Sequence, residues 1–93
     1  MKDQTREALL LLQEECSEVT QATSKCFRFG LDTLYLEETN RDRLEQEIGD
    51  VLAIIDILVN QNEISLDRLS EAKKRKFNKL SKWSTLNIKD MGQ

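Results

Sequence analysis

The sequence contains no proline and only three glycines, so little in it would interrupt a helix or form the turns that a β-sheet needs. Three long segments instead repeat apolar residues with the period of a helix. Ninety-three residues fit one small domain. We therefore expect an all-α fold, a helical bundle in a single domain that spans residues 1–93.

Three helices are predicted, and the residues at their ends support the boundaries. Gly30 is a typical C-terminal stop for the first helix, Thr39 or Asn40 an N-cap for the second, and Ser65 an N-cap for the third. The expected spans are 5–29, 40–61 and 65–83. Residues 31–39 are predicted to be a connection with at most a turn of helix, and 84–93 a loose tail.

Charge and composition exclude several classes of function. The net charge is −3, which argues against nucleic-acid binding, although residues 73–82 hold six of the fourteen lysines and arginines. No apolar run approaches the ~20 residues of a membrane span, and residues 1–10 lack the apolar stretch of a secretory signal. We therefore expect a cytoplasmic protein without a membrane partner.

The two cysteines do not suggest a disulfide or a zinc site. Cys16 and Cys26 lie on one expected helix, separated by roughly 15 Å of helical rise, which is too far for a bond between them. There is no histidine to complete a zinc site. We interpret both as reduced thiols in the core.

Acidic residues interrupt the apolar face of the first expected helix. At ~100° per residue, Glu15 projects into the apolar arc, Glu18 lies at its edge, and Glu14 falls outside it. An ionised carboxylate removed from water costs several kcal/mol unless it is paired or bound to a metal. The arc itself comprises Ala8, Leu9, Leu11, Leu12, Cys16, Val19, Ala22, Cys26 and Phe27.

The second expected helix repeats this pattern. Glu47 and Asp50 fall within an apolar arc that covers more than half of the helix circumference, so we expect two neighbours, one of them from another subunit. The arc comprises Leu44, Ile48, Val51, Leu52, Ile54, Ile55, Ile57, Leu58 and Val59.

The two acidic pairs have the same spacing, since Glu15 and Glu18, like Glu47 and Asp50, are three residues apart and share a helix face. If the first two helices pack antiparallel, the pairs converge, and a hard divalent cation such as Mg²⁺ would relieve their repulsion. A surface position, or salt bridges to Lys73 and Lys76 of the third helix, would also explain them.

The two-part acidic motif resembles that of a known family. "EECSE" followed by "EIGD", with 28 residues between Glu18 and Glu47, is similar to the E-x-x-E … E-x-x-D motif of the MazG-like all-α nucleoside triphosphate pyrophosphohydrolases. "LLLLQEECSEVTQATSK", "RFG" and "EIGDVLAIIDIL" resemble the flanking segments. The likeness covers about residues 5–82 and is closest to short single-domain versions of the kind often carried by bacteriophages.

The resemblance implies hydrolysis of a nucleoside triphosphate to the monophosphate and pyrophosphate with Mg²⁺, for which Mn²⁺ can substitute. It also implies metal ligands, a further acidic residue, and basic or amide residues on the third helix that bind the polyphosphate. The metal ligands would be Glu15, Glu18, Glu47 and Asp50, with Glu14 as the further acid; the substrate-binding residues would be Lys73, Lys76 and Asn78.

Several alternatives remain open at this point. Phe29 or Trp83 would stack on the nucleobase, or else pack in the core or an interface. Within the enzyme class, the substrate would be a range of deoxynucleotides, dUTP or phosphoribosyl-ATP. The competing function is a non-catalytic helical homo-oligomer, a dimer or tetramer, that binds a partner and whose acids pair with Lys73 and Lys76.

Overall fold

The computed structural model describes residues 1–92 and divides them into two compact units, Met1–Gln61 and a second that begins at Asn62. The first contains the helices α1 (Asp3–Phe29) and α2 (Asn40–Asn60), and the second contains α3 (Leu66–Trp83). These three helices confirm the predicted all-α class. No helix within residues 1–92 combines the length and apolar character that crossing a membrane requires.

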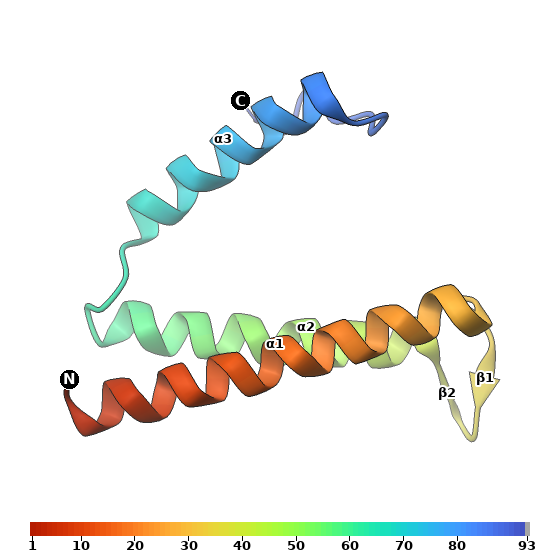
Figure 1. Cartoon of the computed structure of the whole chain (residues 1–93), viewed down its shortest axis with the longest axis horizontal. Helices are drawn as coiled ribbons and strands as arrows, with labels where there is room; N and C mark the ends of the chain where they lie inside the picture. The colour runs from red at the N-terminus through yellow and green to blue at the C-terminus, as the bar shows by residue number, and fades with distance from the viewer. Residues whose placement is uncertain (93) are drawn as a thin grey trace. The chain divides into compact units, whose positions relative to one another are not determined.

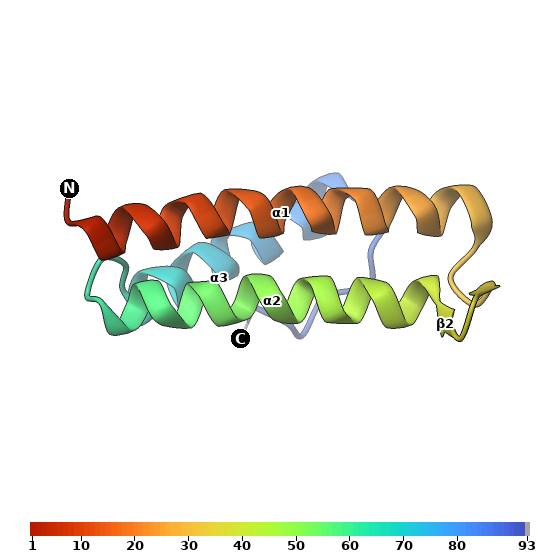
Figure 2. The ribbon, with the colours of Figure 1, turned by 90° about the horizontal axis from the view of Figure 1, so that it is seen from below.

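The two helices of the first unit lie side by side and run in opposite directions (Figures 1 and 2). α1 ends where Gly30 takes a φ of 93°, a conformation that costs glycine little. Its N–H donates to the Cys26 carbonyl oxygen at 2.9 Å. The predicted stop at Gly30 is therefore confirmed.

α2 begins with a reciprocal hydrogen-bonded cap. The Thr39 hydroxyl accepts from the Asp42 backbone N–H at 3.0 Å, and the Asp42 carboxylate accepts from the Thr39 backbone N–H at 3.0 Å. This satisfies two donors that the first turn of a helix otherwise leaves unpaired. Of the two predicted N-caps, Thr39 is the correct one.

The segment between the helices differs from its prediction, because it forms a short hairpin rather than a turn of helix. Strands β1 (Leu34–Tyr35) and β2 (Glu38–Thr39) pair antiparallel, Leu34 opposite Thr39. Leu36 takes a φ of 60° in the two-residue loop, where glycine or asparagine is usual. The ion pair of Arg41 with Asp32, 3.0 Å between Nε and Oδ1, holds the ends of the segment together.

The contact between α1 and α2 follows a repeat of alternating three- and four-residue steps. On α2 the buried residues are Glu47, Ile54 and Leu58, with Val51 half-buried among them. On α1 the buried and half-buried positions of this repeat are Thr5, Ala8, Leu12, Glu15, Val19 and Ala22. Such steps keep one narrow stripe of each helix facing its partner, as in a coiled coil. We call these facing stripes the α1–α2 seam.

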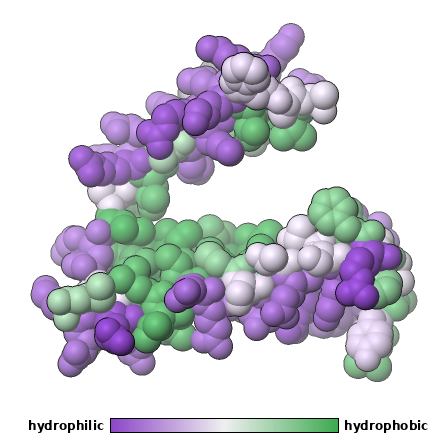
Figure 3. Space-filling model, viewed as in Figure 1, coloured by the Kyte–Doolittle hydropathy of each residue, from purple (hydrophilic) through white to green (hydrophobic). Residues whose placement is uncertain are grey.

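The seam covers less of the apolar arcs than the sequence suggested. Phe27 is 86% exposed and Cys16 is exposed, so the prediction that they lie in the core is wrong, whereas Cys26 is half-buried. On α2, Leu52 is 56% exposed. The reason is geometric, because two helices bury only the stripe along which they touch. Figure 3 shows apolar side chains still gathered on the surface of this helix pair.

The second unit consists of α3 and the segment after it. The Ser65 hydroxyl accepts from the Arg68 backbone N–H at 3.4 Å, which confirms the predicted N-cap. After α3 the chain turns, with the Met91 N–H donating to the Ile88 carbonyl oxygen at 3.1 Å. Gly92 lies against Phe77 and Asn78, so this segment returns to α3. Residue 93, the last of the expected loose tail, lies outside the described residues.

Replacing Thr39 by alanine removes half of the reciprocal cap of α2. We expect the free energy of unfolding to fall by about 1 kcal/mol, since the Asp42 N–H loses its acceptor. Urea unfolding at one fixed protein concentration measures this. Thr20→Ala is the matched control, because Thr20 lies inside α1, where its hydroxyl donates to the Cys16 carbonyl oxygen. An equal loss in both variants would contradict a specific role of the cap.

Candidate metal centre

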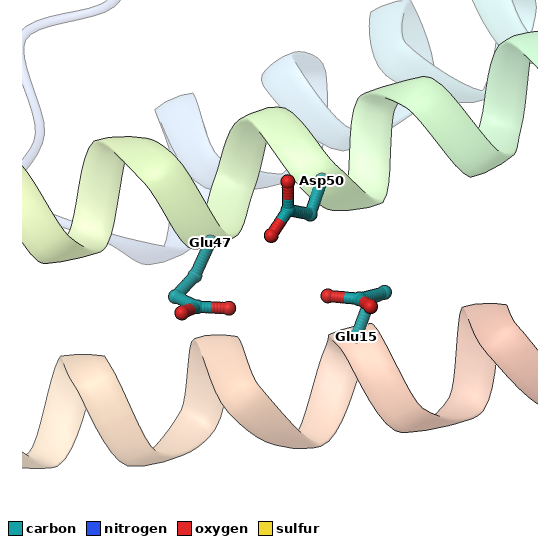
Figure 4. A group of neighbouring side chains, drawn as sticks. All are labelled: Glu15, Glu47 and Asp50. Atoms are coloured by element: carbon teal, nitrogen blue, oxygen red, sulfur yellow. The ribbon is translucent and has the colours of Figure 1, made fainter.

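Three carboxylates converge between α1 and α2. One oxygen each of Glu15, Glu47 and Asp50 lies within 4.8 Å of the other two. Figure 4 shows Glu15 reaching across from α1 toward Glu47 and Asp50, which project from successive turns of α2. We call these three residues the acidic triad.

The α1–α2 seam explains why the triad assembles. Glu15 occupies a seam position, seven residues from both Ala8 and Ala22, whose small side chains are buried. Glu47 occupies the matching position on α2 and is only 6% exposed, whereas Asp50 is exposed at the margin of the seam. Antiparallel packing therefore sets the two glutamates opposite each other.

The buried member of the triad has a cationic neighbour. The Arg43 Nε lies 3.1 Å from the Glu47 Oε1, with the side chains 52% and 8% exposed, respectively. A buried carboxylate needs such compensation. The sequence analysis missed Arg43, although a basic residue four positions before an acid on a helix is a recognisable ion-pair signal.

The electrostatics of the triad disfavour three full negative charges. Partial burial, and after it the charges of Asp50 and Glu47, raise the pKa of Glu15 above its ordinary value. Glu14 and Glu18 raise it further in the same direction. Each of these neighbours is acidic, so a cation bound among them would be strongly favoured.

The donor set of the triad fits a hard divalent cation. Mg²⁺ prefers carboxylate oxygens at about 2.0–2.1 Å in an octahedral shell, so that neighbouring oxygens lie about 2.9 Å apart and opposite ones about 4.2 Å apart. The triad oxygens, within 4.8 Å of one another, would close to these separations through side-chain movement. The exposed margin at Asp50 leaves room for the waters that Mg²⁺ retains.

The other predicted acids lie outside the triad. Glu18 is half-buried, one turn after Glu15 on α1, and its carboxylate is not among the three that converge. Glu14 is exposed, as its position outside the arc predicted. Both are nevertheless close enough to act on the pKa of Glu15.

The predicted residues of α3 belong to the second unit. Lys73 and Lys76 are exposed there, and Trp83 is 85% exposed. Asn78 and Trp83 line one hollow of about 460 Å³, which Lys73 and Lys76 do not line. The α3 candidates therefore fall into two sets. The remaining lining residues of this hollow are Glu71, Lys74, Arg75, Lys79 and Lys82.

A larger pocket lies in the first unit, where the end of α1, the hairpin and the start of α2 meet. Its volume is about 880 Å³, and Phe29 and Arg43 line it together with Lys25 and Tyr35. Phe29 is 54% exposed, and the Arg28 guanidinium lies 4.9 Å from the centre of its ring. We call this the hairpin pocket. Sequence reasoning missed it, because its wall depends on the hairpin.

Comparison with known proteins gives a family for the chain. The family model of the MazG nucleotide pyrophosphohydrolase domain matches residues 4–84, which include α2, α3, the acidic triad and all of α1 except its first residue. Comparisons with curated proteins and with solved structures found no significant match.

Replacing Asp50 by asparagine should stabilise the protein in the presence of a chelator. The folded state raises the pKa of Glu15, so repulsion within the triad opposes folding wherever Glu15 is ionised. Removing the Asp50 charge weakens this repulsion, and the midpoint of thermal unfolding should rise.

Thermal unfolding with and without added Mg²⁺ measures the effect. Mg²⁺ should stabilise the wild type and not Asp50→Asn, since a cation that binds only the folded state raises its stability. Asp56→Asn, at another exposed acid of α2, is the control and should respond to Mg²⁺ like the wild type. An Asp50→Asn variant that is less stable in chelator would show that the triad is not under repulsion.

Proposed function

Since the chain belongs to the MazG nucleotide pyrophosphohydrolase family, we propose that it hydrolyses nucleoside triphosphates, deoxynucleotides included, to the monophosphate and pyrophosphate. Membership of the family indicates a nucleoside triphosphate pyrophosphohydrolase in general; the requirement for Mg²⁺ is part of our proposal. The observation that carries it is the acidic triad, in which α1 and α2 together contribute three converging carboxylates.

In this proposal the triad holds the metal. Glu15, Glu47 and Asp50 would be its direct ligands, with Glu18 as the fourth acid of the set. When bound, Mg²⁺ neutralises charge on the phosphate oxygens and lowers the pKa of a coordinated water. Glu14, exposed beside Glu15, would orient the attacking water through its carboxylate oxygens.

The substrate requires cations and an apolar surface in addition to the triad. Phosphoryl transfer depends mainly on positioning and charge neutralisation. We propose that Lys73 and Lys76 bind the polyphosphate as point charges, with Asn78 as an amide donor. The nucleobase would stack on Phe29 or Trp83, both of which are more than half exposed and so accessible to a ligand.

We also propose that the protein is a homodimer or homotetramer. Leu10 and Leu52 are each more than half exposed on the first unit, and a small protein gains core most readily by association. Apolar side chains extend over the surface of the helix pair in Figure 3. A second copy would remove this surface from water.

Sedimentation velocity tests the association. The wild type should sediment as a dimer or tetramer, and Leu52→Lys should shift the distribution toward smaller species, because it places a charge within the apolar surface. Glu45→Lys, at an exposed acid of the same helix, serves as the control for the added charge. A wild type that stays monomeric across the concentration range would refute the proposal.

The activity is tested by incubating the protein with each common ribo- and deoxynucleoside triphosphate and Mg²⁺, and measuring pyrophosphate and monophosphate. The Glu47→Gln, Asp50→Asn double variant should lose at least about a hundredfold in rate, since even residues behind metal ligands contribute 10- to 100-fold. Glu45→Gln should retain the wild-type rate. Wild-type release no greater than that of the double variant would end the enzymatic proposal.

A further inference from the structure

Arg43 stands between the acidic triad and the hairpin pocket. Its Nε lies 3.1 Å from the Glu47 Oε1, and its side chain also lines the hairpin pocket. The carboxylate it approaches is the most buried of the triad, while the arginine side chain itself is 52% exposed. One cationic group thus adjoins both the proposed metal site and a space that a ligand could enter.

Arg41, two residues earlier, is an arginine whose guanidinium is paired with both oxygens of one carboxylate. Its Nε and one terminal nitrogen donate to the two Asp32 carboxylate oxygens at 3.0 and 3.3 Å. Arg43 is equally exposed, yet within residues 1–92 its only ion pair is the one to Glu47, and that contact lacks hydrogen-bond geometry. Its guanidinium donors therefore remain available to an anion.

The hairpin pocket has the size and chemistry to take a nucleotide. Its volume of about 880 Å³ lies within the 300–1,000 Å³ typical of small-molecule sites. Phe29 and Tyr35 provide aromatic rings, and Lys25 adds a second cation to Arg43. Glu37 and Glu38 also line the pocket. A ligand with an aromatic base would therefore place its negative charge at Lys25 and Arg43, away from these two acids.

A metal ion and Arg43 would compete for the same carboxylate. Glu47 belongs to the triad whose oxygens converge, and it is also the partner of Arg43. A divalent cation bound by Glu47 neutralises that carboxylate and weakens its attraction for the guanidinium. Arg43 then lacks an anionic partner. Its planar guanidinium can bind two oxygens of a phosphate at once, which a lysine ammonium cannot do with the same geometry.

We propose that Arg43 is a substrate-binding residue, which passes from the Glu47 carboxylate to a phosphate oxygen of a nucleotide in the hairpin pocket when a metal ion occupies the triad. This rests on the proposed function, since it assumes that the triad holds the metal of a nucleotide hydrolase. Metal binding thereby releases Arg43 for the substrate, so that the metal binds first and the nucleotide second.

Calorimetry with Arg43→Gln separates this role from a structural one. Mg²⁺ alone should bind Arg43→Gln as tightly as the wild type or more tightly, because a competitor for Glu47 is gone. With Mg²⁺ present, the α,β-methylene analogues of the nucleoside triphosphates should bind the variant roughly 10- to 100-fold more weakly, as expected for a charged hydrogen bond. Arg43→Lys should restore part of this loss.

Arg6→Gln is the matched control, because it removes an exposed arginine of α1 that belongs to neither the acidic triad nor the lining of the hairpin pocket. It should leave both the Mg²⁺ and the analogue affinity at the wild-type level. If Arg43→Gln weakens Mg²⁺ binding in step with analogue binding, Arg43 only orients Glu47 and our inference is wrong. Unchanged analogue affinity would overturn it equally.

The binding measurements need no turnover, so they distinguish a failure of this inference from a failure of the proposed function. A wild type that releases pyrophosphate, with an Arg43→Gln variant of unchanged KM and analogue affinity, would keep the function and refute the role of Arg43. A wild type that shows no turnover, but whose analogue binding depends on Arg43, would refute the proposed function and support the role of Arg43. A wild type that binds no analogue in Mg²⁺ would refute the inference.

Discussion

The packing of α1 against α2 along one narrow seam is the constraint on which the proposed site depends. Steps of three and four residues bring Thr5, Ala8, Leu12 and Val19 to one stripe of α1, and the same steps bring Glu15 to that stripe. On α2 they place Glu47 in line with Ile54 and Leu58. Positions that would normally hold apolar residues therefore hold two opposed carboxylates.

This arrangement places a source of instability at the proposed metal site. Glu47 is buried about as deeply as Ile54 and Leu58, the buried apolar residues of its helix, and Arg43 offsets its charge from one side only. The raised pKa of Glu15 shows the cost of holding its charge partly buried and close to the charges of the neighbouring acids. Such local conflict within an otherwise consistent pattern is typical of functional sites. Arg43, whose side chain is about half exposed, contacts Glu47 of the triad and also lines the hairpin pocket.

Helical period and end residues were sufficient to predict much of the first unit from the sequence. Local chemistry alone identifies Gly30 as the end of α1, and it narrows the N-cap of α2 to Thr39 or Asn40. The inward position of Glu15 follows from its spacing to residues on the same face. The convergence with Glu47 also required antiparallel packing, which the short connection between the helices favours.

The features that the sequence did not reveal depend on tertiary structure or on unusual backbone. The hairpin turns at Leu36, whose φ of 60° no propensity would assign to leucine, and the hairpin pocket depends on that turn. Phe27 lies within the apolar arc and is nevertheless exposed, because α2 covers only the seam. The roles of Lys73 and Lys76 stay predictions, since they belong to the second unit.

The central claim is that Glu15, Glu47 and Asp50 form one metal site, and paramagnetic Mn²⁺ tests it most directly. In a ¹⁵N-labelled sample, substoichiometric Mn²⁺ should broaden the amide signals around residues 15, 47 and 50 of both helices together. Signals near Thr5, ten residues and about 15 Å of helix away, should be affected far less. Broadening spread over the exposed acids of the chain, or confined to one helix, would contradict the account.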